Sequence, residues 1–268
     1  MSHPHTDTDH TDGEHAPASP STAVDDAIAA FSRGDPVLIH DFADREGETD
    51  IVYPATAVDA AAVSRLRNDA GGLICVALAD SVCAAFGLPF LQDTLDHPAA
   101  ADHDLAYDER SSFSLTVNHR ETFTGITDVD RARTISELGA AAAAVEVDDA
   151  RDPAEDNARD PAENDAREAA EDNAAGVSDA SDAFADSFRV PGHVHLLRAA
   201  PDLLADRLGH TELALALAEV AGQPPATVVC EMLDDTTGRA RSPADAAAYA
   251  ARHGLVYVEG SALVDRLG

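Results

Sequence analysis

Short apolar runs alternate with helical patterns along most of the chain, and this alternation constrains the fold more than any other feature. Strands are predicted at residues 36–39, 51–54, 73–77, 113–117, 194–199, 226–231 and 255–258. Helices are predicted at residues 23–32, 57–68, 80–86, 128–139 and 210–221, after Ser242 and after Ser261. Residues 91–111 show little pattern and are expected to form a loop. Strands that alternate with helices favour a layered α/β domain, but they do not fix the order of the strands.

An acidic stretch, residues 41–50, separates the first two predicted strands. It holds five carboxylates and one guanidinium, a density that a turn does not need for solubility. In extended backbone Glu46, Glu48 and Asp50 project to one side, where they repel one another unless a cation or a protonated partner holds them. Two interpretations follow: a site for a divalent metal ion and sugar hydroxyls, or an acidic surface loop in a very acidic protein.

The formal net charge of −32 comes from 50 acidic residues against 18 arginines, and the chain has no lysine. The absence of lysine excludes a Schiff-base mechanism and a Walker-type phosphate lysine. Nucleic acid is a poor partner, because its phosphates would meet a strongly negative field. Acids spread along the whole chain suggest adaptation to high salt, where screening weakens self-repulsion, so we expect a halophilic source.

The three cysteines, Cys75, Cys83 and Cys230, form no CxxC pair, so neither a disulfide framework nor a zinc cluster is expected. No apolar run reaches the length of about 18 residues that a membrane span needs, and no signal-peptide pattern is present. We therefore expect a soluble, cytoplasmic protein without a membrane partner.

Two polar segments fall outside the alternating pattern. Residues 1–20 carry four histidines among Asp, Thr, Ser and Pro, and we expect a disordered tail there, although histidine-rich tracts also bind metal. Residues 148–183 contain an eight-residue repeat with almost no large apolar side chains, which cannot bury enough surface to offset its ordering entropy. We interpret it as an acidic insertion in one domain spanning residues 21–268, because the chemically richest residues lie on both sides of it.

A second candidate site lies at residues 207–212, where a helix is predicted to begin. Free N–H groups at a helix start favour an anion, and Arg207 adds a charged fork suited to phosphate. Gly209 would let a ligand approach the backbone, and Thr211 would add a hydroxyl. His210 can bind a metal ion or transfer protons. The alternative is an ordinary helix cap with a surface histidine.

Other candidates are weaker. His193 and His195 face the same way in a strand, which suits one catalytic histidine and one hydrogen-bonded structural histidine better than a zinc site. Residues 123–127 either present hydroxyls to a substrate or form a turn and a helix cap. Glu231 ends an apolar strand, where an acid is costly unless it is paired or functional. Cys75 lies on a buried-looking strand, where a core role is commoner than catalysis.

Taken together, these stretches resemble the 3,4-dihydroxy-2-butanone 4-phosphate synthase family from about residue 22 onward, apart from the insertion. Residues 44–50, DREGETD, are similar to the family signature DRENEGD, with Gly47 and Thr49 as substitutions. Further matches are TGITDVDR at residues 124–131 to TG-[VI]-[ST]-x-x-DR, PGHVHLLRA at residues 191–199 to PGHV-x-x-LRA, GHTE at residues 209–212, and Cys230-Glu231 to a late glutamate.

The resemblance implies an enzyme of riboflavin biosynthesis that converts D-ribulose 5-phosphate to L-3,4-dihydroxy-2-butanone 4-phosphate and formate. It implies that Glu46 and His210 bind Mg²⁺ or Mn²⁺. The implied substrate-binding positions are Arg45, Asp50, Thr124, Arg207, Gly209, Thr211 and Glu231. The implied catalytic positions are Asp41, Glu48, Cys75, His193 and Glu231. It also implies a homodimer with sites near the subunit interface.

The expected fold class is α/β (α+β), a single three-layer domain with a mixed twisted sheet flanked by helices. In the implied reaction, a metal ion chelates neighbouring oxygens of a ketose and acidifies the carbon between them. Loss of the C1 hydroxyl, skeletal migration and release of C4 as formate would follow. Two other functions fit the same residues: a metal-dependent sugar-phosphate isomerase, which conserves carbon, and a non-catalytic module that binds metal or phosphate.

Overall fold

The computed structural model describes residues 20–268, except residues 101–107, 109 and 150–178. A seven-stranded sheet runs through its centre in the order β4-β5-β3-β6-β2-β1-β9. The strands are β1 (Val37–His40), β2 (Thr49–Pro54), β3 (Cys75–Leu78), β4 (Phe113–His119), β5 (Phe188–Arg198), β6 (Ala226–Val229) and β9 (Val256–Glu259). β1 pairs with β9, and β3 with β5, in parallel, while the other pairs are antiparallel. The predicted mixed sheet is confirmed.

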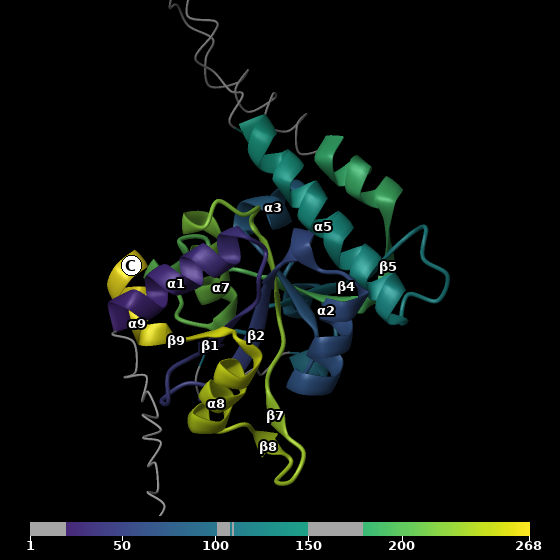
Figure 1. Cartoon of the computed structure of the whole chain (residues 1–268). Helices are drawn as coiled ribbons and strands as arrows, with labels where there is room; N and C mark the ends of the chain where they lie inside the picture. Colours follow the sequence, from purple (N-terminus) through teal and green to yellow (C-terminus); the bar gives the residue numbers. More distant parts are fainter. Residues whose placement is uncertain (1–19, 101–107, 109, 150–178) are drawn as a thin grey trace, which may run out of the picture.

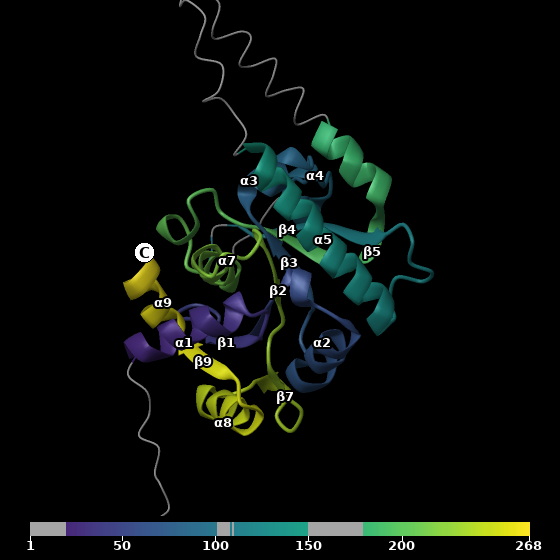
Figure 2. The ribbon, with the colours of Figure 1, turned by 45° about the horizontal axis from the view of Figure 1, so that its top comes forward.

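Helices cover both faces of this sheet (Figures 1 and 2). One face carries α1 (Pro20–Ser32), α7 (His210–Val220) and α9 (Gly260–Leu267), and the other carries α2 (Ala60–Arg65), α5 (Asp128–Asp149) and α8 (Pro243–His253). Both faces of the sheet can be covered because successive side chains of a strand point to opposite faces. Leu38 and Ile51 join the core under α2, α5 and α8, whereas Ile39 and Val52 join the core under α1, α7 and α9. This three-layer arrangement is the predicted one.

Smaller elements complete the described part of the chain. They are α3 (Asp80–Ala85), α4 (Leu91–Thr94), and the projecting hairpin of β7 (Leu233–Asp234) and β8 (Arg239–Ala240). Residues 179–187 are also helical and lie beside α5 in both views (Figures 1 and 2). Among the described helices, none is long and apolar enough to cross a bilayer.

Several predicted boundaries are wrong. α4 and a 3₁₀ turn at Pro98–Ala100 lie within the expected loop at residues 91–111. The predicted insertion at residues 148–183 overlaps helical residues at both ends, because α5 continues to Asp149 and residues 179–187 are helical. The centre of that insertion, and all of the predicted tail except Pro20, lie outside the described residues.

Three segments meet at one end of the sheet and place the candidate site there. They are the turn between β1 and β2, the first turn of α7, and the chain just after β6. Asp50 in β2 forms an isolated antiparallel bridge with Glu231, and the Met232 N–H donates to the Thr49 carbonyl oxygen at 2.8 Å. Backbone pairing therefore fixes the two acidic segments against each other.

Candidate active site

A cavity of about 940 Å³ opens where these segments meet. Many of its polar side chains are those that the sequence singled out: Arg45, Glu46, Glu48, Asp50, Cys75, Arg207, His210, Thr211 and Glu231. Part of its remaining wall comes from residues between Leu91 and Phe113, including Arg110 and Ser112. Segments from the two ends of the chain thus converge on one concave surface, which is the arrangement expected of a small-molecule site.

The acidic turn is held in shape by Asp41. This carboxylate is buried, and its two oxygens accept the backbone N–H groups of Glu46 at 3.2 Å and Glu48 at 2.9 Å. Gly47 lies between them with φ of 65°, a conformation that favours glycine. The expectation that Glu46, Glu48 and Asp50 alternate in extended backbone is wrong, because residues 43–46 form a turn and only Asp50 lies in β2.

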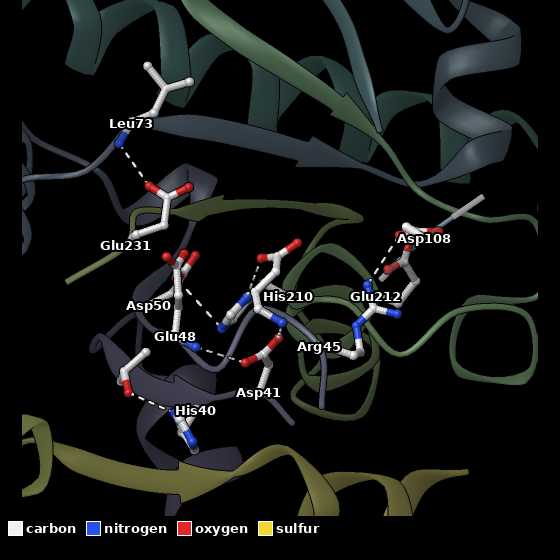
Figure 3. Close-up of polar contacts among 12 residues, drawn as sticks. His40, Asp41, Arg45, Glu48, Asp50, Leu73, Asp108, His210, Glu212 and Glu231 are labelled. Carbon is white, nitrogen blue, oxygen red and sulfur yellow. Dashed lines mark hydrogen bonds and ion pairs between the residues drawn. The ribbon is translucent and has the colours of Figure 1, made fainter. Parts of the chain in front are cut away.

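His210, the first residue of α7, lies between acids from the other end of the chain (Figure 3). Its Nδ1 is 3.5 Å from Glu46 Oε2, and its Nε2 is 3.6 Å from Asp50 Oδ1. Asp41, Glu46 and His210 each offer one ligand atom, and these atoms lie within 4.8 Å of one another. The structure therefore brings together the two residues expected to bind the metal ion, with Asp41 as a third possible ligand and the second oxygen donor.

The environment separates the proton affinities of these groups. The hydrogen bond from His210 lowers the pKa of Glu46, although burial opposes this shift. Burial raises the pKa of Asp50, and the neighbouring carboxylates raise it further. Burial, with Glu231 and Glu46, also raises the pKa of Glu48. Burial alone would lower the pKa of His210, but Asp50 and Glu46 outweigh it and raise that pKa. Groups with such different affinities can hold and release protons side by side.

Arg45 and Arg207 form a cationic group in the same cavity as His210. Arg45 is shown in Figure 3. Arg207 Nη1 contacts Glu212 Oε2 at 3.0 Å, and both arginines contact Asp108. A Cβ on Gly209 would lie only 2.9 Å from Arg207 Nη1. The sequence predicted that a ligand could approach the backbone at Gly209, but the Arg207 side chain occupies that space.

Sequence reasoning gave no role to Asp108 or Glu212. Glu212 is fully buried in the first turn of α7, a position where acids are common as partners of free N–H groups. That signal was available in the sequence. The contacts of Asp108 with Arg45 and Arg207 are tertiary, and no local pattern indicates them.

Glu231 and Cys75 lie on the β-sheet side of the cavity. β6 ends at Val229, so Glu231 follows the strand and does not end it as predicted. Glu231 Oε2 accepts the Leu73 N–H at 2.8 Å, and a Cβ on Gly72 would come within 2.3 Å of that oxygen. Cys75 is buried, and burial raises the pKa of its thiol well above the ordinary value, so it is a neutral thiol near neutral pH.

Thr124 and His193 do not line this cavity. They form a second cluster around Asn118, a residue that the sequence analysis did not single out. Asn118 Oδ1 accepts the His193 N–H at 2.8 Å, and the Asn118 side chain packs so closely on Gly125 that a Cβ there would collide with it. The Thr124 hydroxyl donates to Asp130 Oδ2 at 3.1 Å, and the hydroxyl of Thr127 caps the helix by accepting the Asp130 N–H at 3.1 Å.

Within the described chain, His195 lacks, at its Nδ1, the hydrogen bond that a structural histidine was expected to make. Its Nδ1 is buried and has no hydrogen-bond partner among the described residues. Burial lowers the pKa of its imidazole, which is therefore neutral near neutral pH.

Comparison with known proteins decides which family has this arrangement. The model of the family described as 3,4-dihydroxy-2-butanone 4-phosphate synthase matches residues 25–266. The chain belongs to this family. Its relatives include the 3,4-dihydroxy-2-butanone 4-phosphate synthase of Archaeoglobus fulgidus, 42% identical over 90% of this chain and 92% of the relative, and that of Methanothermobacter thermautotrophicus, 38% identical over 90% and 94%.

Solved structures of the family share the fold. A 3,4-dihydroxy-2-butanone 4-phosphate synthase in complex with two magnesium ions is 25% identical and superposes with a TM-score of 0.64. The match covers 91% of this chain and 95% of that one. The synthase family thus accounts for nearly the whole chain, on both sides of the acidic repeats.

Proposed function

We propose that this protein converts D-ribulose 5-phosphate to L-3,4-dihydroxy-2-butanone 4-phosphate and formate, as a lyase of riboflavin biosynthesis. The observation that carries the proposal is the meeting of Glu46, Asp50 and His210 beside Arg45 and Arg207 in one cavity. A sugar phosphate needs both parts: a site for a metal ion at its oxygens and a cationic site at its phosphate.

The residues present fit a divalent metal ion. Glu46 and His210 would bind Mg²⁺ or Mn²⁺, and Asp41 supplies a further oxygen nearby. His210 Nε2 and Asp50 Oδ1 are buried without a hydrogen-bond partner among the described residues, which is costly unless a ligand contacts them. When bound, the ion supplies Lewis acidity to the oxygens of the ketose, so that the proton between them is released more easily.

The phosphate would lie at the start of α7. Arg45 and Arg207 present charged N–H groups there, and Thr211 lines the same cavity. The N-terminus of a helix adds N–H groups and a positive dipole end. These contacts hold the substrate by its phosphate, away from the reacting carbons, so their binding energy is used to orient the substrate.

Two carboxyl groups suit proton transfer. Glu48 and Asp50 have raised pKa values, so each can hold a proton that Glu46, with its lowered pKa, has lost. In our proposal an ionised carboxylate takes the proton from the sugar carbon, and a protonated one donates to the departing C1 hydroxyl. Skeletal migration and release of C4 as formate then complete the reaction.

We further propose that the enzyme is a homodimer in which Thr124 and His193 of one copy complete the cavity of the other. Both residues lie outside the cavity of their own chain. Around them lies an exposed apolar patch of Phe123, Ile126, Val129 and Val190, with Phe123 94% exposed. Arg189 Nη2 donates to the Thr122 carbonyl oxygen at 3.3 Å and links the two parts of this patch. Exposed apolar patches of this kind mark protein interfaces.

Three further properties belong to the proposal. Residues 21–268 act as one synthase domain, because the synthase cavity draws on segments before and after the repeats. The three cysteines are free and buried, which fits a reducing cytoplasm. The 50 acids support a halophilic source, where high salt screens their repulsion.

The central test uses Glu46→Gln and His210→Ala. Each variant should lose formate release from ribulose 5-phosphate by at least about 1,000-fold, because each removes a ligand of the metal ion. Circular dichroism should show an intact fold. The matched control is Glu219→Gln, an exposed residue farther along α7, which should retain wild-type turnover. Full activity in either site variant would refute the metal assignment.

The product distinguishes the proposal from its alternatives. A sugar-phosphate isomerase would conserve all five carbons and release no formate. A binding module would bind ribulose 5-phosphate and Mg²⁺ but would form no product, with or without chelator. Formate that disappears on chelation and returns with Mg²⁺ supports the synthase reaction.

A further inference from the structure

Asp108 lies beside Arg45 (Figure 3) and contacts both arginines of the cavity. A single oxygen, Oδ2, contacts Arg45 Nη2 at 3.1 Å and Arg207 Nε at 2.5 Å. The three side chains are only 11–16% exposed, so water weakens these ion pairs little. Hydrogen bonds from both arginines outweigh burial and lower the pKa of Asp108, which is therefore ionised near neutral pH.

This contact leaves the arginines incompletely matched. One carboxylate oxygen serves both of them, and the buried Nε of Arg45 has no hydrogen-bond partner among the described residues. Two guanidinium groups offer more donors than one oxygen can accept. A phosphate group carries more charge and three terminal oxygens, so it suits the pair better than Asp108 does.

Arg207 does not depend on Asp108 for its position. Glu212 Oε2 contacts Arg207 Nη1 at 3.0 Å, while Glu212 Oε1 accepts the Ala200 N–H at 3.1 Å. Glu212 is fully buried, and the absence of a Cβ on Gly209 makes room for the ion pair. If Asp108 moved away, Glu212 would still hold the guanidinium, and the Nε edge of Arg207 would be open to another anion.

We propose that Asp108 is an internal competitor for the anion site: its carboxylate occupies the position of the substrate's phosphate on Arg45 and Arg207 and lowers the affinity for that phosphate. The inference rests on the proposed function, because it assumes that these arginines receive the phosphate of a sugar phosphate. Asp108 is then a residue that sets substrate affinity, and it takes no part in the bond-breaking steps.

Asp108→Asn tests the inference, because the amide has the same shape but forms no ion pair. Inorganic phosphate, titrated calorimetrically into the metal-free protein, should bind about 10-fold more tightly if Asp108 occupies the site about nine-tenths of the time. The KM for ribulose 5-phosphate should fall by a similar factor, and kcat/KM should rise. Glu212→Gln should have the opposite effect and weaken phosphate binding, because Arg207 loses its fixed partner.

The matched control is Asp206→Asn. Asp206 is exposed and close to Arg207 in sequence, but its carboxylate accepts the Asp202 N–H and pairs with no arginine in the described structure. Phosphate affinity should change less than twofold in this variant, so a general charge effect is separated from the specific contact.

Every result of the phosphate titration either supports or overturns the inference. Weaker phosphate binding in Asp108→Asn would show that Asp108 holds the arginines in place, and unchanged binding would show that it does not compete; either result overturns the inference. The calorimetric measurement needs no turnover. A wild-type protein that forms no formate would refute the proposed function, while tighter phosphate binding in Asp108→Asn would still establish competition at these arginines.

Discussion

Asp50 is the residue at which burial and function conflict most directly. Its side chain is almost fully buried, and Oδ1 has no hydrogen-bond partner among the described residues. Because burial disfavours the charged form, the pKa of Asp50 is higher in the folded state than in the unfolded chain. Between the unfolded pKa of 3.8 and the folded pKa of about 8, the folded state binds more protons, so Asp50 lowers the stability of the metal-free protein as the pH rises through this window.

Asp50→Asn should therefore stabilise the metal-free protein while it abolishes activity. We expect the free energy of unfolding to rise by about 1–2 kcal/mol at pH 7, with a smaller gain at pH 4, where Asp50 is protonated in the folded state and partly protonated in the unfolded state. Denaturant titrations at the two pH values, with EDTA present, measure this. Asp35→Asn, at an exposed ion pair with Arg33, is the control and should change stability little at either pH. A loss of stability at pH 7 would contradict the argument.

At this scale, the sequence predicts residue types better than their contacts. Glu46 and His210 stand in motifs, so both were recognised although they meet only in the folded chain. Asn118, which holds His193, and Asp108, which holds two arginines, stand in no motif and act through contacts with distant segments. Gly72 is a further case, because only the structure shows the Glu231 side chain packed against it.

Among the elements, the pairing of β4 with β5 depends on one glycine. Val117 pairs with Val194, but Asn118 pairs with Arg189, so residues 190–193 of β5, Gly192 among them, fall between two consecutive pairs and interrupt the register. A Cβ on Gly192 would lie 1.9 Å from the Val117 carbonyl carbon and 2.2 Å from the Asn118 nitrogen. Both are backbone atoms, which cannot move aside as a flexible side chain can.

Gly192→Ala should consequently destabilise the protein by about 3–5 kcal/mol, because the two strands must separate to admit the methyl group. Gly238→Ala is the control: Gly238 has φ of 67° in the β7–β8 hairpin, but no heavy atom within 4 Å would meet its Cβ. That change should cost only the conformational strain of about 1–2 kcal/mol. Urea denaturation of both variants compares them, and equal losses would argue against a backbone collision at Gly192.

Element boundaries show where local patterns fail. The start of α8 was predictable, since the Ser242 hydroxyl accepts the Asp245 N–H at 3.2 Å, as its sequence indicates. The predicted end of α5 at Gly139 is wrong because this glycine is a packing site: a Cβ there would lie 2.8 Å from the Thr56 nitrogen. A glycine that ends a helix and one that admits a neighbouring backbone look alike in sequence.

For the whole molecule, the proposed dimer is the property with the clearest test. Phe123→Asp places a charge at the most exposed large apolar side chain among the described residues. Light scattering should show the mass of a monomer, and formate release should fall by at least about 100-fold because Thr124 and His193 no longer reach a partner's cavity. Mg²⁺ binding should persist, since Glu46 and His210 belong to one chain. Val220→Asp, at the exposed end of α7, is the control and should remain dimeric.

The order of strands could not be predicted from sequence, because it depends on pairing between distant segments. β6 lies between β2 and β3 and joins them, although it follows both by most of the chain's length. During synthesis on a ribosome, β2 and β3 therefore emerge long before β6, and each has an unpaired edge until β6 is made. A nascent chain that stops before residue 226 has two half-sheets and no way to join them, so translation must near its end before this sheet can close.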